Sequence, residues 1–134
     1  MRIGEASKRS GVSAKLIRHY EATGLLRPAE RAENGYRIYT PIDVHELRFI
    51  KRARSLGFSI AAIGELLSLW RDKTRPSRSV RALAQRHLAV LDARLTATEQ
   101  MADTLRELIA ACRGDHRPEC PILENLSRGR LVGI

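Results

Sequence analysis

Apolar positions recur every three or four residues through most of this chain, and short polar segments separate the repeats. That spacing places the apolar side chains on one face of a helix, so the chain is predicted to be mainly α-helical. Ser13, Thr40 and Ser59 each precede such a segment and can accept a hydrogen bond from a free backbone amide, as helix caps do. The four helices expected in the first half span residues 3–9, 14–22, 42–56 and 60–71.

One segment of the first half breaks the helical pattern. Residues 31–39 contain Asn34-Gly35, a strong hairpin signal because both residues tolerate a positive φ. The hairpin is predicted to present Tyr36 and Arg37 near its tip. A small core is expected from Ile3, Ala6, Val12, Leu16, Ile17, Leu25 and Leu26.

The longest uninterrupted segment follows a polar break at residues 73–77. Residues 79–112 contain neither Gly nor Pro and predict one helix about 50 Å long, at 1.5 Å per residue. Its apolar stripe is too long to be buried against the short domain before it, so we expect an antiparallel coiled coil with a second copy. Three polar residues interrupt the heptad seam: His87, Arg94 and Thr98. The seam itself comprises Val80, Ala84, Leu88, Leu91, Leu95, Met101, Leu105, Leu108 and Ile109.

The distribution of charge narrows the choice of partner. The formal net charge is +9, which favours an anionic partner such as nucleic acid or an acidic membrane. Residues 1–54 carry twelve Lys and Arg against six Asp and Glu, and so hold +6 of that charge. This segment also contains the first two helices, which a short turn at Gly11 separates, and the hairpin. The pattern therefore favours duplex DNA.

Composition also bears on where the protein acts. Apolar residues make up 43% of the chain and aromatic residues only 4%, so the core is expected to be mostly aliphatic. No apolar run is long enough to span a bilayer, and no signal peptide opens the chain. We therefore expect a cytoplasmic protein that does not contact a membrane.

The second helix and the hairpin carry the candidate DNA contacts. A recognition helix presents its early residues to base edges, while nearby cations bind phosphates. Arg18 is suited to either task, because its guanidinium can bind guanine in a bidentate manner or bind a phosphate. Tyr20 and Tyr39 are either contacts or core residues, and both interpretations stay open. The candidate contacts are Lys15, Arg18, His19, Tyr20, Arg31, Tyr36, Arg37 and Arg54.

Cys112 and Cys120 flank a segment with Gly114 and Pro118, which predicts a loop over residues 113–119. A short amphipathic helix is expected next, with Cys120 at its N-terminus, where the helix dipole and free amides stabilise a thiolate. The spacing alone leaves a metal site, a redox-active dithiol and inert thiols open.

Ligand chemistry discriminates among metals at such a site. Zn(II) takes four ligands, whereas two soft thiolates satisfy a monovalent ion such as Cu(I), Ag(I) or Au(I). His116, in the same loop, is a further candidate ligand, although an exposed loop histidine is the simpler interpretation.

Three motifs resemble the MerR family of bacterial transcription regulators, over essentially the whole chain. They are I-R-H-Y-E-x-x-G-L at residues 17–25, E-N-G-Y-R-x-Y at 33–39, and a C-x7-C pair that runs into C-P-I-x-E-N-L at 120–126. The first two resemble the family at large. The third resembles its copper-responsive branch, which includes CueR- and HmrR-like regulators.

The resemblance implies a homodimer that binds palindromic promoter DNA and activates transcription by distorting it for RNA polymerase. Cu(I), or Ag(I) or Au(I), would bind Cys112 and Cys120 and trigger that distortion at copper efflux or detoxification genes. The resemblance also places the partner's Ser77 above the ion, where sensors of divalent metals commonly carry Cys. Arg81, one turn later, would offset the negative charge of the bis-thiolate complex.

One alternative function uses the same scaffold: a redox regulator in which Cys112 and Cys120 form a reversible disulfide. An enzyme is not expected, because the sequence contains no nucleotide-binding loop, carboxylate pair or supported Ser/His/Asp arrangement. The expected organisation is a winged helix-turn-helix DNA-binding domain over residues 1–72, a dimerisation helix over 79–112, and a metal-binding loop with a short helix over 112–128.

Overall fold

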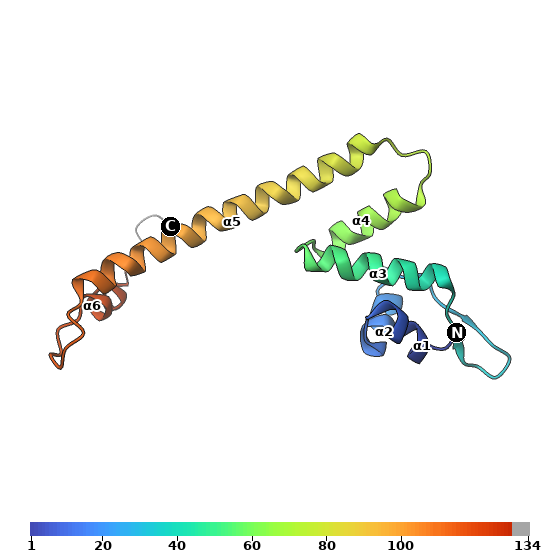
Figure 1. The fold of residues 1–134 in the computed structure, drawn as a ribbon, viewed down its shortest axis with the longest axis horizontal. Coiled ribbons are helices and arrows are strands. Elements are labelled where there is room, and N and C mark those ends of the chain that lie inside the picture. Colours follow the sequence, from blue (N-terminus) through green and yellow to red (C-terminus); the bar gives the residue numbers. More distant parts are fainter. Residues whose placement is uncertain (130–134) are drawn as a thin grey trace. The chain divides into compact units, whose positions relative to one another are not determined.

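The computed structural model describes residues 1–129, which form six helices and one two-stranded antiparallel sheet (Figure 1). The fold is mainly helical, as predicted. It divides into two compact units, Met1–Ala84 and the part from Gln85 onward, and the division falls inside the long helix. In chain order the elements are α1 (Ile3–Ser10), α2 (Ala14–Ala22), β1 (Glu30–Arg31), β2 (Arg37–Ile38), α3 (Pro41–Ser55), α4 (Ile60–Arg71), α5 (Ser77–Ala111) and α6 (Pro121–Arg128).

The helices begin where the sequence places their caps. The Ser13 and Ser59 hydroxyls accept hydrogen bonds from backbone amides three residues later, at 3.2 and 3.1 Å. At the start of α3, the Thr40 hydroxyl accepts from the Asp43 amide at 3.2 Å, and the Asp43 carboxylate accepts from the Thr40 amide at 2.8 Å. This reciprocal capping box satisfies two free amides and, with Pro41 at the first helical position, fixes the start of the helix.

The hairpin turn differs in detail from the prediction. Gly35 has a φ of +84°, but Asn34 keeps a negative φ. The Asn34 side chain instead accepts a hydrogen bond from the Tyr36 amide at 3.2 Å, and the Gly35 amide donates to the Ala32 carbonyl at 2.9 Å. The asparagine thus stabilises the turn through its side chain and not through a left-handed backbone. The paired residues are Glu30 with Ile38 and Arg31 with Arg37.

The core of the first unit lies among α1, α2, α3, α4 and the hairpin. Tyr20 and Tyr39 are 2% and 1% exposed, so the structure favours the core interpretation for both. Leu16, predicted to be core, is 40% exposed, because α2 buries the face with Ile17 and each helical residue advances about 100° around the axis. The buried cluster comprises Ala6, Val12, Ile17, Tyr20, Leu25, Leu26, Tyr39, Val44, Leu47, Ile50, Ala53, Ile63 and Leu67.

Buried carboxylates connect α3 to its neighbours. The Asp43 side chain is 2% exposed and accepts from the Arg27 Nε at 3.0 Å. The Glu46 side chain is 4% exposed and accepts from Arg71 through both carboxylate oxygens, at 2.7 and 3.1 Å. A buried carboxylate is costly unless it is paired, so these arginines hold α3 to the segment after α2 and to the end of α4.

The apolar stripe of α5 is largely exposed in the single chain. The helix has 35 residues and begins two residues before the predicted start. An exposed apolar row of this length marks a site of association. The exposed members of the row include Leu88, Leu91, Leu95, Met101, Leu105 and Ile109.

Among the described residues, no helix is both long enough and apolar enough to cross a membrane.

Removing the cation that pairs with Glu46 should destabilise the first unit. We expect Arg71→Ala to lower the free energy of unfolding by about 1–3 kcal/mol, because it leaves a buried carboxylate without its main donor. The matched control is Arg106→Ala, whose ion pair with Asp103 has side chains 72% and 70% exposed. That control should cost less than about 1 kcal/mol in urea denaturation. Equal losses in the two variants would contradict the importance of the Glu46 pair.

Candidate nucleic-acid interface and thiol pair

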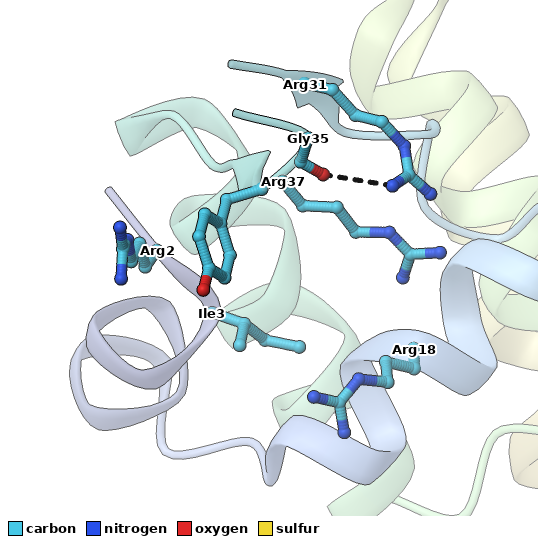
Figure 2. Close-up of a pocket in the computed structure, with 7 residues that line it drawn as sticks. Arg2, Ile3, Arg18, Arg31, Gly35 and Arg37 are labelled. Atoms are coloured by element: carbon cyan, nitrogen blue, oxygen red, sulfur yellow. Dashed lines mark hydrogen bonds between the residues drawn. The ribbon is translucent and has the colours of Figure 1, made fainter. Parts of the chain in front are cut away.

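An arginine-rich cleft of about 440 Å³ opens between the start of α1, the helix α2 and the hairpin (Figure 2). Its cations come from separate elements: Arg18 from α2, Arg31 from β1 and Arg37 from β2. The fold therefore brings together residues that the sequence separates widely. The full lining consists of Arg2, Ile3, Arg18, Arg31, Gly35, Tyr36 and Arg37.

Local contacts orient these cations. The Arg31 Nη1 donates to the Gly35 carbonyl at 3.0 Å, which holds this guanidinium across the hairpin turn (Figure 2). The Arg37 Nη1 lies 3.7 Å from the Oε2 atom of the buried Glu21. Guanidinium groups in a shared cleft suit phosphate oxygens, because each offers several donors in one plane.

Glu21 joins α2 to the hairpin through its buried carboxylate. Its side chain is 7% exposed and accepts a short hydrogen bond from the Tyr39 hydroxyl and another from the Ala29 amide at 3.3 Å. Burial, followed by the bond to Glu21, raises the pKa of Tyr39 to about 12. The sequence alone assigned no role to Glu21. The one feature that could have pointed to it is that Glu21 is the single acid among the cations of the second helix.

The other predicted contacts lie outside the cleft. Lys15 and His19 are exposed on α2, as the helical pattern predicts. The buried Tyr20 is the exception, because its ring belongs to the core and its hydroxyl accepts from the Arg54 Nη1 at 3.3 Å. Tyr20 therefore belongs to the core beneath α2, and its hydroxyl holds the Arg54 side chain through this hydrogen bond.

The two cysteines meet in the second unit. Their Sγ atoms lie 3.6 Å apart, and both residues are partly buried. Cys112 follows the last turn of α5, and its amide donates to the Leu108 carbonyl at 3.1 Å. Cys120 is the N-cap of α6, where the Leu123 amide, and then the Cys112 thiol, lower the pKa of its own thiol. The thiolate form is thereby favoured at this position.

The separation of the sulfurs suits two kinds of chemistry. Cys112 and Cys120 would hold a soft metal ion through their two thiolates, and an ion placed between the sulfurs would move them apart. A disulfide requires about 2.05 Å and therefore the opposite movement. No group of three or more His, Cys, Asp and Glu suited to a metal occurs within residues 1–129.

The remaining predicted site residues lie elsewhere on the chain. Ser77 is the first residue of α5, and Arg81 follows one turn later; both are exposed and belong to the first unit. His116 is exposed in the loop between α5 and α6.

Two family models match this chain. The model of the MerR HTH family regulatory protein matches residues 1–70, and the MerR DNA-binding model matches residues 44–108. The chain belongs to the MerR family. The first match contains the whole arginine cleft, and the second contains most of α3, all of α4 and most of α5.

Relatives within the MerR family extend the match. The chain is 54% identical over 129 residues to the heavy metal-dependent transcription regulator 2 of Rhizobium meliloti, covering 96% of this chain and 88% of the relative. It is 38% identical over 127 residues to the regulator CueR of Salmonella typhimurium, covering 95% and 92%.

A solved structure supports the same assignment. A transcription regulator of Ralstonia metallidurans in complex with lead(II) is 30% identical, with a TM-score of 0.84 and coverage of 94% of this chain and 98% of that one. The MerR-type helix-turn-helix followed by a long helix is therefore confirmed. The family and these relatives are transcription regulators, in agreement with the prediction that the chain is not an enzyme.

The bond between Tyr39 and Glu21 predicts a pH-dependent stability. At neutral pH, Tyr39→Phe should lower the free energy of unfolding by about 1–2 kcal/mol, because Glu21 loses a donor. Folding raises the pKa of this phenol from 10.0 to about 12. The advantage of the wild type is therefore complete below pH 10 and is lost as the pH rises toward 12. Urea denaturation of both proteins over this range should show the gap narrowing; a constant gap would contradict the coupling.

Proposed function

We propose that this MerR-family protein is a Cu(I)-responsive transcriptional activator of copper efflux and detoxification promoters. The observation that carries the proposal is the meeting of Cys112 and Cys120 at 3.6 Å, at the junction of a long helix and a short one. Relatives named as heavy metal-dependent regulators and as CueR support a metal as the signal.

The donor set favours a monovalent ion. Two thiolates supply soft, negatively charged ligands, and the pair becomes a complex of net charge −1 with Cu(I). Ag(I) and Au(I) share this charge and ligand preference, so they are expected to bind as well. Zn(II) would require ligands beyond these two sulfurs. The solved relative with lead(II) shows that the same fold accommodates a heavy-metal complex in another protein.

The exposed stripe of α5 supports a homodimer. In an antiparallel pair of long helices, the start of one helix lies beside the end of the other. This arrangement would bring the partner's Ser77 to the thiol pair, and Arg81 would supply a cation to offset its charge. The proposed regions are the DNA-binding domain at residues 1–72, the dimerisation helix at 79–112, and the metal-binding loop with the short helix at 112–128.

The arginine cleft and the exposed face of α2 form the proposed DNA surface. The two copies in a dimer would contact successive half-sites of a palindrome. Tyr20 would act through Arg54, which its hydroxyl holds at 3.3 Å. RNA polymerase would then use the distorted promoter, and the protein would act in the cytoplasm. The contacts proposed on this surface are Lys15, Arg18, His19, Arg31, Tyr36, Arg37 and Arg54.

Signal transmission requires the ion to bind two states of the protein unequally. The short helix α6 offers a suitable element, because Leu123 and Leu126 are 64% and 67% exposed in the single chain. Cys120 is the N-cap of this helix. If the Cys120 backbone moves when its sulfur accepts the ion, the helix would move with it. Apolar surface that is buried in only one state then supplies the difference in free energy.

Neutralising the cleft should weaken DNA binding. Arg18→Ala and Arg37→Ala are each expected to lower affinity for promoter DNA, because each removes a phosphate or base contact. For Arg37→Ala, the slope of log affinity against log salt should also flatten by about one unit. Gel-shift titrations at several salt concentrations measure both effects, and Arg106→Ala on α5 is the matched charge control. Wild-type affinity in both cleft variants would rule out this surface.

Removing either sulfur should separate sensing from DNA binding. Cys112→Ser and Cys120→Ser are each expected to abolish high-affinity Cu(I) binding and copper-dependent transcription, because one thiolate cannot complete a two-coordinate site. Affinity for promoter DNA without copper should stay within about twofold of the wild type, since the thiols belong to the other unit.

Spectroscopy separates copper sensing from the redox alternative. X-ray absorption of the loaded wild type should report two sulfur neighbours per copper. Tetrahedral coordination dominated by nitrogen and oxygen would contradict the copper assignment. A disulfide that forms after peroxide treatment and activates transcription in the absence of copper would instead favour the thiol-redox regulator.

A further inference from the structure

Arg2 lines the cleft, and it lies outside the sequence motifs that point to DNA binding. Its Cζ lies 4.1 Å from the centroid of the Tyr36 ring, within the range of a cation–π contact. Figure 2 shows Arg2 on one side of the cleft and Arg31 and Arg37 on the other. Tyr36, at 56% exposure, therefore presents an aromatic face to Arg2 while remaining accessible from the cleft.

The backbone around Arg2 is fixed on both sides. The Met1 amino group donates to the Tyr39 carbonyl at 2.8 Å, and the Tyr39 amide donates back to the Met1 carbonyl at 2.7 Å. On the other side, Arg2 is the N-cap of α1, and its carbonyl accepts from the Glu5 and Ala6 amides at 3.1 and 3.0 Å. Chain termini are commonly mobile unless tied down, and these bonds tie this one to both the hairpin and α1.

Stacking leaves the donors of Arg2 available. A guanidinium stacks through its flat face, whereas its N–H groups point outward in the plane and remain free to bind an anion. The neighbouring cations are more committed, since Arg31 donates to a carbonyl and Arg37 lies beside the Glu21 carboxylate. Holding a flexible arginine in one orientation also reduces the entropy lost when it binds.

We propose that Arg2, held against Tyr36, is a further DNA-binding residue that contacts a backbone phosphate at the rim of the cleft. This inference rests on the proposed function, because it assigns a role within the same surface. The Arg2–Tyr36 pair then acts as a unit: the ring positions the guanidinium, and the guanidinium supplies charge and donors. A phosphate contact contributes to affinity on any sequence and to its salt dependence.

The test compares Arg2→Ala with Arg9→Ala. Arg9 lies on α1 outside the cleft and pairs with Glu5 at 2.8 Å, so its removal is an equal change of charge in the same unit. The probe is a duplex selected by the wild-type protein from a random pool. Any affinity tag is placed at the C-terminal end, because the Met1 amino group is engaged by the hairpin.

The expected result is a loss of affinity of about three- to tenfold for Arg2→Ala, with a salt slope about one unit flatter, and no change of slope for Arg9→Ala. Arg2→Lys should keep the slope and lose part of the affinity, because it retains charge without a planar stack. Tyr36→Ala should weaken binding less in an Arg2→Ala background than in the wild type. Melting temperatures of all variants exclude a loss of folding as the cause.

Three results overturn the inference in different ways. If Arg2→Ala matches Arg9→Ala while Arg18→Ala and Arg37→Ala weaken binding, the cleft binds DNA and Arg2 does not contribute. If Arg18→Ala and Arg37→Ala also keep wild-type affinity, the proposed DNA surface itself fails. An unchanged salt slope in Arg2→Ala, whatever its affinity, overturns the assignment of a phosphate contact.

Discussion

The buried carboxylate of Glu21 is the constraint on which the proposed DNA surface depends. A two-residue strand pair cannot hold a hairpin in place by itself, because it offers too few backbone hydrogen bonds and little apolar surface. Glu21 replaces that missing support by accepting from Tyr39 and Ala29 on the hairpin side while belonging to α2. The second helix and the hairpin are therefore joined through one buried side chain, which sets the backbone positions from which their arginines extend.

A second constraint arises from what the chain leaves uncovered. The first unit buries an aliphatic core around Tyr20 and Tyr39, whereas α5 exposes a row of large apolar side chains that residues 1–129 leave uncovered. A stripe of this length is stable in water only against a matching surface. Pairing with a second copy would satisfy it and place two DNA surfaces in one assembly. The dimer proposed for this chain would therefore bury the exposed stripe of α5 as well as bring two DNA surfaces together.

Sequence predicts local features of this protein well and long-range contacts poorly. The serine and threonine caps and the Gly/Pro breaks act within a few residues, so the starts of α2, α3 and α4 follow from the sequence. The role of Glu21 depends on a hydroxyl 18 residues away, and the fixed position of Arg2 depends on backbone bonds to Tyr39 across 38 residues. Neither pairing has a local signal. Leu16 shows another limit of prediction from the sequence. It was expected in the core but is exposed, because a difference of one residue turns a side chain about 100° around the helix axis.

The sequence indicates that the two thiols can act as a pair, but it does not predict how far apart their sulfurs lie. Seven intervening residues with a glycine and a proline allow the two sulfurs to meet, yet the same spacing also allows them to point apart. The fold decides between these outcomes, since α5 anchors one sulfur at its end and α6 anchors the other at its N-cap. Because the second anchor is the N-cap of a helix, a change in sulfur separation that displaces the Cys120 backbone also displaces α6. In the proposed function, a two-ligand site attached to the N-cap of α6 would convert the arrival of one ion into a displacement of the apolar surface of that helix.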